Sequence, residues 1–472
     1  MDLEFRSQVP TVTAGMLSDL QVVTRRMSDL GFTEANIEVA LGVRPLSFRR
    51  LHQILPYRAR LKAHGSLGIA ISFWLLQEWI SLEQAREALG DHAVSVLNQM
   101  GWLHVTSAGL RSRVDLYPCC GRYFFTDSAN NAFPWPEQVY WLGFDSYTLA
   151  YCTPRQARAR ALDICTGSGV HAILARAHCQ QSLGLDINPR ALDFSRLNAR
   201  LNGLEAEFHS SDCYQTVEGQ QFDLITLNPP FVPTPDLVPE LYRTGGDTGE
   251  SVTRRVVEGL PQFLRPGGLF SMSTEAPRRH NESPVDRMKS WLGPGWGMVG
   301  LHKQDFTIED YILGHLLGSD VEAAGREAEF QRWLDTYQQA GITAMTSAQF
   351  YALRLPAGTP AWSWERDYPH PLSDQSAFLQ DWLVALQAWH SAWPPDFQPH
   401  IHPAVRQIYF AEDCAMVEWN GTHWFAAPTR LESAHAQVLR QVLQGATLAE
   451  LEETSARQLG CSLVLSAPVG NP

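Results

Sequence analysis

The tetrapeptide Asn228-Pro229-Pro230-Phe231 combines side chains and backbone suited to holding a nitrogen nucleophile. It follows the apolar run at residues 222–227, so a polar side chain is expected where a buried strand ends. Two prolines in series fix φ and remove two backbone donors, which leaves a rigid loop that presents acceptors. The Asn228 side-chain oxygen and the Pro229 carbonyl can together accept both hydrogens of an –NH₂ group, and Phe231 offers a flat face. The tetrapeptide therefore predicts a site for group transfer to a planar amide or amino nitrogen.

A glycine turn within residues 161–172 is the second chemical signal. A buried strand leads into Gly167 and Gly169, which permit positive φ and close approach of a ligand to the backbone, and a helix follows. The spacing of these glycines also fits a dinucleotide fingerprint, with Asp186 at a suitable distance for a ribose. Asp163 favours another ligand, because its carboxylate can accept from a cationic amino acid head and would repel a pyrophosphate.

Three aspartates at the ends of successive expected strands indicate one shared ligand. Asp186 can accept both hydroxyls of a ribose, and Asp212 is placed to accept from an adenine amino group. A helix cap or a turn explains each aspartate taken alone. Together with Asp163, they favour S-adenosyl-L-methionine over a dinucleotide.

Residues 140–275 resemble a class I S-adenosylmethionine-dependent methyltransferase with the N/D-PP-Y/F signature of amino-methylating enzymes. The stretch 228–234 followed by Gly-Gly-Asp-Thr-Gly at 245–249 is similar to the HemK type, which methylates the glutamine of the GGQ motif in translation release factors. Gly143-Phe144-Asp145-Ser146 resembles the segment that covers the cofactor in this superfamily. Phe231 departs from the tyrosine usual in HemK-type enzymes and is frequent in related ribosomal RNA guanine and adenine methyltransferases.

The resemblance implies a set of site residues. The predicted catalytic residues are Asn228, Pro229, Pro230 and Phe231. The predicted contacts to S-adenosyl-L-methionine are Asp163, Thr166, Gly167, Gly169, Asp186, Ile187, Asp212, Cys213 and Asn228. Cys165 is interpreted as a small buried residue rather than a nucleophile. No metal is expected, since His400 and His402 have no third ligand at a suitable spacing.

The elements that must position these residues alternate between strands and helices from residue 135 to 358. Strands are expected at Arg160–Cys165, Gln181–Leu185, Phe222–Leu227 and Gly268–Ser273. Helices are expected at His171–His178, Arg190–Asn202 and Gly249–Leu264. This order predicts an α/β fold, a doubly wound Rossmann-like methyltransferase domain. Met298–Gln304 and Ala344–Leu355 are expected to close the sheet, with a helical insertion at Ile308–Gln339.

The flanking regions predict two further domains. Residues 1–134 contain helical patterns and then a small hairpin, which indicates a mainly helical, winged-helix-like domain for substrate recognition. Residues 359–472 predict an α+β accessory domain. There, a helical stretch rich in tryptophan (Trp362, Trp364, Trp382, Trp389 and Trp393) precedes a hairpin turn at Asn420-Gly421 and a helix from Glu432 to Leu443.

Composition bounds the class of protein. The 472 residues are 44% hydrophobic and 18% charged, as in globular proteins. No uninterrupted apolar run is long enough for a membrane span, and the first residues lack a secretory pattern. The eight cysteines are scattered, which favours free thiols in a reducing, cytoplasmic setting. The formal net charge of −13 argues against a surface that coats nucleic acid.

These observations favour an enzyme, an S-adenosylmethionine-dependent N-methyltransferase. A protein glutamine of the translation machinery is the preferred substrate. The alternative is an exocyclic base amine in ribosomal RNA or another nucleic acid, and a small-molecule amine is a third. A basic run either contacts phosphates or forms a solvated helix face, and it comprises Arg44, Arg49, Arg50, Arg58, Arg60 and Lys62. A binding module without turnover and a dehydrogenase are the competing classes.

Overall fold

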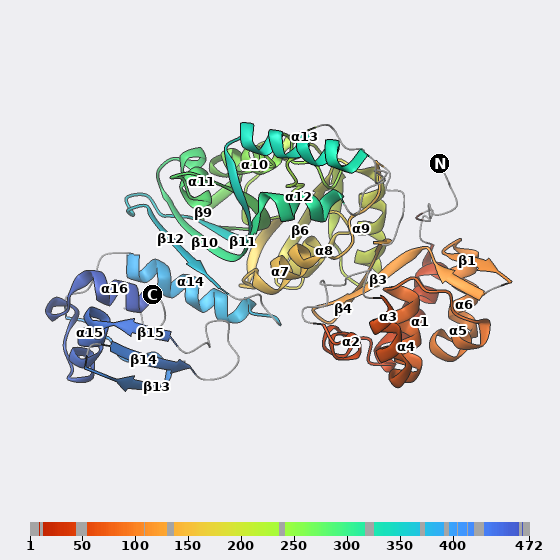
Figure 1. Ribbon diagram of the computed structural model, residues 1–472, viewed down its shortest axis with the longest axis horizontal. Coiled ribbons are helices and arrows are strands. Elements are labelled where there is room, and N and C mark those ends of the chain that lie inside the picture. Colours follow the sequence, from red (N-terminus) through yellow and green to blue (C-terminus); the bar gives the residue numbers. More distant parts are fainter. Residues whose placement is uncertain are drawn as a thin grey trace.

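The computed structural model describes residues 9, 13–43, 54–107, 109–129, 136–235, 241–316, 325–368, 373–390, 396–403, 405–412, 414–419, 429–461 and 465. Figure 1 shows a central α/β body with an N-terminal lobe and a C-terminal lobe at opposite ends of the molecule. Among the described residues, no helix combines the length and the apolar character needed to cross a membrane.

An eight-stranded sheet forms the central body, in the order β12-β10-β11-β9-β8-β5-β6-β7. The strands are β5 (Arg158–Ile164), β6 (Cys179–Asp186), β7 (Glu207–Ser210), β8 (Phe222–Leu227), β9 (Leu264–Arg279), β10 (Trp296–Thr307), β11 (Ile342–Arg354) and β12 (Trp362–Asp367). The five strands from β7 to β9 pair in parallel. β11 is antiparallel to both β9 and β10, as the expected closing pair requires. The predicted doubly wound α/β fold is confirmed.

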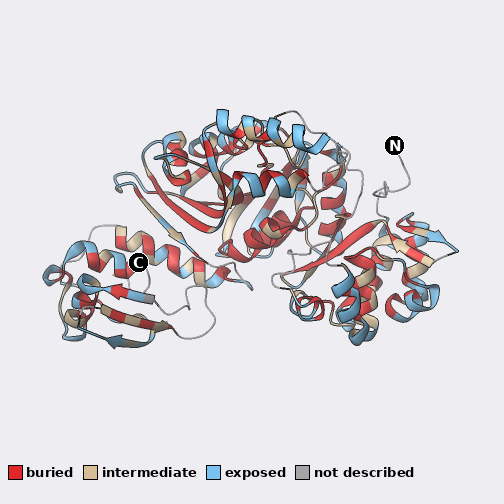
Figure 2. Ribbon diagram, viewed as in Figure 1, coloured by how far each residue is buried: buried red, intermediate tan, exposed pale blue. Residues whose placement is uncertain are grey.

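Helices cover both faces of this sheet. They are α7 (Phe144–Cys152), α8 (Val170–Arg176), α9 (Pro189–Leu201), α10 (Ser251–Phe263) and α11 (Pro284–Leu292). Adjacent residues of β8 belong to different cores: Leu224 to the core that contains α8 and α9, and Ile225 to the core that contains α10 and α11. Because successive side chains of a strand point to opposite faces, the two helix groups lie on opposite sides of the sheet. Figure 2 shows the resulting buried interior of the body.

Two helices interrupt the closing strand pair, as the sequence predicted. α12 (Ile308–Leu316) and α13 (Arg326–Gln339) lie between β10 and β11 and build a third apolar core. Val232, directly after the tetrapeptide, is part of that core and is 3% exposed. The Tyr337 hydroxyl of α13 also donates to the Pro233 carbonyl oxygen at 3.2 Å. The insertion therefore supports the loop that carries the tetrapeptide.

The N-terminal lobe is mainly helical, as expected. It contains α1 (Ala14–Asp29), α2 (Glu34–Leu41), α3 (Ile54–Leu61), α4 (Gly65–Trp74), α5 (Leu82–Leu89) and α6 (Asp91–Gln99), followed by the hairpins β1 (Leu103–Thr106) with β2 (Gly109–Ser112) and β3 (Val114–Cys119) with β4 (Arg122–Asp127). β4 joins the lobe to α9, because the Asn198 side chain bonds both the backbone N–H and the carbonyl of Phe125 at 2.9 Å. Arg190 adds an ion pair with the buried Asp127.

The C-terminal lobe combines α14 (Ser376–His390), α15 (Ser433–Leu443) and α16 (Glu453–Cys461) with a three-stranded antiparallel sheet. Its strands are β13 (Val405–Phe410), β14 (Cys414–Trp419) and β15 (Thr429–Glu432). The helical interpretation of the stretch with Trp362 and Trp364 is wrong. These residues belong to β12, which extends the central sheet in parallel with β10, so backbone pairing overrides the tryptophan pattern. Asn420-Gly421 and Trp393 lie outside the described residues.

Candidate active site

A cavity of about 960 Å³ opens where the parallel strands β5, β6 and β8 end. This edge, where the strand order reverses, is where open α/β sheets bind ligands. The volume is near the top of the ~300–1,000 Å³ range of ligand pockets, so it has room for a cofactor and part of an acceptor. The structure brings these sequence-predicted residues together in its lining: Thr166, Gly167, Asp186, Ile187, Asp212, Cys213, Asn228, Pro229, Pro230 and Phe231.

Asp163 lies on β5 beneath this lining and is 1% exposed. One carboxylate oxygen, Oδ2, accepts from the Thr166 hydroxyl at 2.6 Å and from the Ala172 backbone N–H at 3.2 Å. The other, Oδ1, accepts from the Thr226 hydroxyl at 2.7 Å. Burial raises the pKa of Asp163 to about 7. Through these hydrogen bonds the carboxylate holds the glycine turn from below.

Asp186 and Asp212 border the cavity from the ends of the next two strands. Asp186 accepts from the backbone N–H groups of Gly167 and Asn188 at 2.8 and 2.9 Å, which ties the end of β6 to the glycine turn. Burial raises the pKa of Asp186. Asp212 pairs with Arg255 of α10 at 2.8 Å, and this hydrogen bond lowers the pKa of Asp212. Both carboxylates retain lone pairs with which a ligand can interact.

Gly169 and Cys165 shape the turn between β5 and α8. Gly169 has φ +84° and caps α8, although it lies beside the cavity lining rather than in it. Cys165 also has a positive φ, of 57°. Burial and neighbouring carboxylates raise the pKa of its thiol well above the usual range, so the thiol stays protonated.

Asn228, at the end of β8, differs in hydrogen bonding between the two ends of its side-chain amide. Its Nδ2 donates to Asp145 Oδ2 at 2.7 Å and to Ser146 Oγ at 3.3 Å, both in the first turn of α7. Its Oδ1 is buried and has no hydrogen-bond partner within the described part of the chain. A buried acceptor without a donor is uncommon and costs ~1–3 kcal/mol. The amide oxygen is therefore an acceptor suited to a hydrogen-bond donor of a ligand.

Glycines after the tetrapeptide are required by the packing of its loop. Gly249 has φ +74°, and a Cβ there would lie 2.4 Å from the Phe231 carbonyl oxygen. Val232 exchanges backbone bonds with this returning segment: its N–H donates to the Arg243 carbonyl at 3.0 Å, and its carbonyl accepts from the Gly245 N–H at 2.9 Å. The paired motifs at 228–234 and 245–249 thus form one folded unit.

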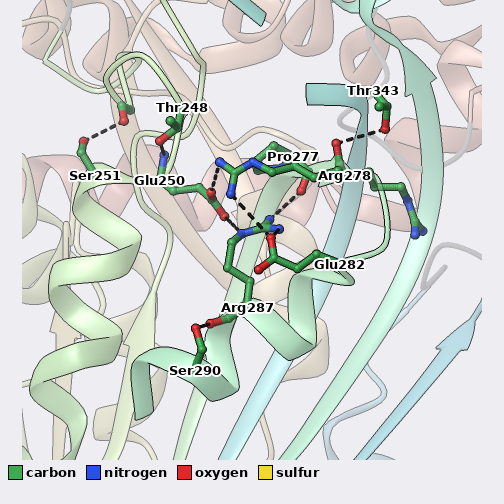
Figure 3. Close-up of polar contacts among 11 residues, drawn as sticks. Thr248, Glu250, Ser251, Pro277, Arg278, Glu282, Arg287, Ser290 and Thr343 are labelled. Atoms are coloured by element: carbon green, nitrogen blue, oxygen red, sulfur yellow. Dashed lines mark hydrogen bonds and ion pairs between the residues drawn. The ribbon is translucent and has the colours of Figure 1, made fainter. Parts of the chain in front are cut away.

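A partly buried ion cluster anchors the end of this unit (Figure 3). Glu250, the N-cap of α10, accepts from Arg287 Nε at 2.8 Å and from Arg279 Nη2 at 3.0 Å. Arg287 also donates to Glu282 at 3.1 Å and to the Pro277 carbonyl at 2.6 Å. We call these four charged residues (Glu250, Arg279, Glu282 and Arg287) the anchor cluster.

Aromatic rings line another part of the cavity, and the sequence analysis did not identify them. Tyr140 lies 4.7 Å from Trp141 and 5.3 Å from Tyr242, measured between ring centroids. All three residues line the cavity, together with His315 from α12. We call Tyr140, Trp141, Tyr242 and His315 the aromatic wall. These residues come from three separate segments, so no local spacing could have revealed the wall.

The family model of the methyltransferase small domain matches residues 143–282, which contain the glycine turn, the three aspartates and the tetrapeptide. Residues 143–282 form a methyltransferase small domain. The family implies S-adenosyl-L-methionine as the cosubstrate, in agreement with the sequence analysis.

The relatives of this domain agree on the class of enzyme. A release factor glutamine methyltransferase of Koribacter versatilis is 34% identical over 132 residues, 25% of this chain and 47% of that protein. A release factor glutamine methyltransferase of Synechocystis is 26% identical over 52% of this chain and 89% of its own length. The crystal structure of ribosomal protein L11 methylase from Lactobacillus delbrueckii has 22% identity and a TM-score of 0.19, and covers 24% of this chain and 50% of that one. The chain thus spans about half the length of the Koribacter relative.

In the part of the basic run that the structure describes, two arginines bond within the N-terminal lobe. Arg58 pairs with Glu78, and Arg60 donates to the Leu41 carbonyl. Arg44, Arg49 and Arg50 lie outside the described residues. Within the ranges that the structure describes, no three His, Cys, Asp or Glu side chains gather as a metal site would require.

Proposed function

We propose that this protein is an S-adenosylmethionine-dependent N-methyltransferase whose substrate is the side-chain amide of a protein glutamine in the translation machinery. One observation carries the proposal: Asn228 presents a buried amide oxygen, unpartnered among the described residues, in the same cavity as the glycine turn and Asp186. The names of the relatives, which are glutamine methyltransferases of release factors and of ribosomal protein uL3, support the choice of glutamine.

The residues of the cavity fit the donor and the acceptor. Asp186 and Asp212 offer carboxylates to the ribose and the adenine of the methyl donor, and Asp163 offers negative charge beneath its cationic end. When bound, S-adenosyl-L-methionine supplies an electrophilic methyl group. Asn228 Oδ1 and the Pro229 carbonyl accept the two N–H hydrogens of the acceptor amide and so aim its nitrogen.

The same two oxygens stabilise the positive charge that develops on the nitrogen as its bond to carbon forms and the carbon–sulfur bond breaks. The nitrogen then loses one proton to solvent. Because this proton leaves after the transfer, the site needs orientation and electrostatic stabilisation more than a strong base.

Methyl transfer to a recombinant release factor tests this proposal. Radiolabelled S-adenosyl-L-methionine, the full-length protein and the release factor are incubated, and label is located by protease digestion and mass spectrometry. We expect one methyl group on a glutamine amide. Asn228→Ala is expected to lower kcat by about 10²–10³-fold, the size seen when one stabilising group is removed, and to leave cofactor affinity near that of the wild type.

Gln262→Ala is the matched control, because Gln262 has an exposed side-chain amide on α10 and does not line the cavity. It is expected to retain full activity. Equal loss of cofactor binding and of transfer in Asn228→Ala would refute the role assigned to this side chain.

The aromatic wall favours one second candidate, methylation of an exocyclic base amine in RNA. Tyr140, Trp141 and Tyr242 offer faces on which a base can stack, and such stacking contributes ~1–3 kcal/mol per base. The same assay on cell extract separates the candidates: label released by nuclease supports RNA, and label released by protease supports protein.

We also propose roles for the flanking parts and a place of action. The methyltransferase domain spans residues 135–358 with β12 added to its sheet, and residues 1–134 recognise the larger substrate. The remainder of residues 359–472 forms an accessory domain. A substrate in the translation machinery places the enzyme in the cytoplasm, and fractionation of cells that carry a tagged full-length protein checks this.

A further inference from the structure

We propose that Asp145 is a positioning residue that fixes the orientation of the Asn228 amide, so that the amide oxygen is presented to the acceptor nitrogen. The inference rests on the proposed function, since it assigns Asp145 a part in the same methyl transfer. Asp145 is the second residue of α7 and is 7% exposed.

The chemistry of the two partners determines which atoms form this bond. A carboxylate is acceptor-only, so the atom of Asn228 at 2.7 Å from Asp145 Oδ2 must be the donor nitrogen Nδ2. A rotation of the amide by 180° about its last bond would place Asn228 Oδ1 against this carboxylate. The resulting repulsion of two acceptors excludes that orientation while Asp145 is charged. The charge on Asp145 thereby determines which end of Asn228 is left for a ligand.

Hydrogen bonds and a nearby cation favour the charged form of Asp145, against the effect of burial. The Tyr140 hydroxyl donates to Asp145 Oδ1 at 2.9 Å, and the position in the first turn of α7 places the carboxylate at the positive end of the helix. Burial raises the pKa of Asp145, and the bonds from Asn228 and Tyr140 together with the charge of Lys303 on β10 oppose that rise.

Glu275 on β9 is a second carboxyl group that interacts with Asp145. It accepts from the Tyr311 hydroxyl at 2.6 Å, and burial raises its pKa to about 7. Lys303 donates to Thr148 Oγ1 at 3.3 Å and lies 4.5 Å from the centroid of the Phe144 ring, both in α7. We call Asp145, Glu275 and Lys303 the site cluster. When both carboxyl groups are ionised, the net negative charge of the cluster complements the positive charge formed on the acceptor nitrogen.

The orientation of Asn228 can be tested without any substrate. Full-length protein labelled with ¹⁵N-asparagine is titrated between pH 5 and 8, and the Asn228 side-chain NH₂ signals are assigned by their loss in Asn228→Ala. We expect these signals to shift with pH in the wild type, to stop shifting in Asp145→Asn, and to keep shifting in Glu275→Gln. Signals that do not move in the wild type, or that still titrate in Asp145→Asn, would overturn the proposal.

Kinetics then test the consequence for transfer. Asp145→Asn keeps the size of the side chain and is expected to lower kcat about 10²-fold with a cofactor Kd within about twofold of wild type, as expected for a misplaced acceptor. Tyr140→Phe removes a bond that favours the charged carboxylate, so the acidic limb of its kcat profile should move to higher pH. Asp193→Asn removes an exposed charge on α9 and serves as the unaffected control.

The amide titration and the kinetic measurements distinguish a failure of the positioning role from a failure of the proposed substrate. Unchanged kcat in Asp145→Asn overturns the positioning role even if the glutamine substrate is correct. Absence of methyl transfer to the release factor in the wild type refutes the proposed substrate, and the amide titration then decides the role of Asp145 alone.

Discussion

The anchor cluster and the site cluster are both groups of buried and half-buried charges near the same loop, yet they differ in charge balance. The anchor cluster sets two guanidinium groups against two carboxylates, and both oxygens of Glu250 accept from an arginine. The site cluster sets one ammonium group against two carboxylates, and its neighbour Asn228 keeps an unpartnered oxygen.

This difference in charge balance indicates a structural role for the anchor cluster and a functional role for the site cluster. Guanidinium groups remain charged at any working pH, so the anchor cluster acts as a fixed support for the loop and for the start of α10. In the site cluster, burial brings the pKa of Glu275 to about 7 and that of Lys303 to about 8, so its charge responds to ligands near neutral pH. Groups with pKa values displaced in this way are typical of sites that bind or react.

Removal of Glu250 should have the largest effect on folding. Glu250→Ala removes the buried carboxylate that Arg287 and Arg279 share and leaves them with the more exposed Glu282, and breaking a buried pair costs ~3–5 kcal/mol. Urea denaturation measures the free energy of unfolding. The matched control is Glu258→Ala on the same helix, because Glu258 forms an exposed i,i+4 pair with Arg254 that contributes only ~0.3–0.5 kcal/mol. Similar losses in both variants would show that burial gives the anchor cluster no special weight.

Asp163 lies on the cofactor side of the cavity, so its titration should change the affinity for the cofactor. A cationic cofactor favours the ionised carboxylate, whose pKa in the free protein is about 7. As the pH falls below about 7, Asp163 takes up a proton and affinity should weaken by up to about tenfold per pH unit, because binding then requires proton release. Calorimetry from pH 5.5 to 8 measures this. Asp163→Asn should show a flat profile, and an unchanged slope in that variant would contradict the prediction.

Lys303→Met should have the smallest effect on stability. The variant removes a desolvated ammonium group and keeps an apolar stem, so stability near pH 7 should stay within ~1 kcal/mol of wild type or rise. The lowered pKa means that the folded wild type holds fewer protons than the unfolded chain between pH 8 and ~10.4, so its stability relative to Lys303→Met should increase over that window.

Lys303→Met should also change the pH dependence of catalysis. The charge of Lys303 lowers the pKa of Asp145, so its removal should move the acidic limb of the kcat profile to higher pH. A loss of stability as large as that of Glu250→Ala would place Lys303 with the supporting charges instead.

Local patterns in the sequence were enough to predict the fold and the core of the site. The predicted strand at Phe222–Leu227 matches β8 at both ends, and the glycine turn, Asp186 and the tetrapeptide meet in one cavity. A strand was expected before Asp212, but the sequence did not define the range of β7, because only one of its four residues is buried and no apolar pattern marks its limits. β9 is longer than predicted, because its later half is held by pairing with β11.

Only the tertiary structure decided which groups face the tetrapeptide. Asp145 and Asn228 are 83 positions apart, the aromatic wall comes from three segments, and the anchor cluster joins α10 to β9 and α11. A strand or a glycine turn follows from the periodicity and φ preferences of neighbouring residues. A hydrogen bond between distant residues follows from how the sheet and its helices pack, and no local spacing records that.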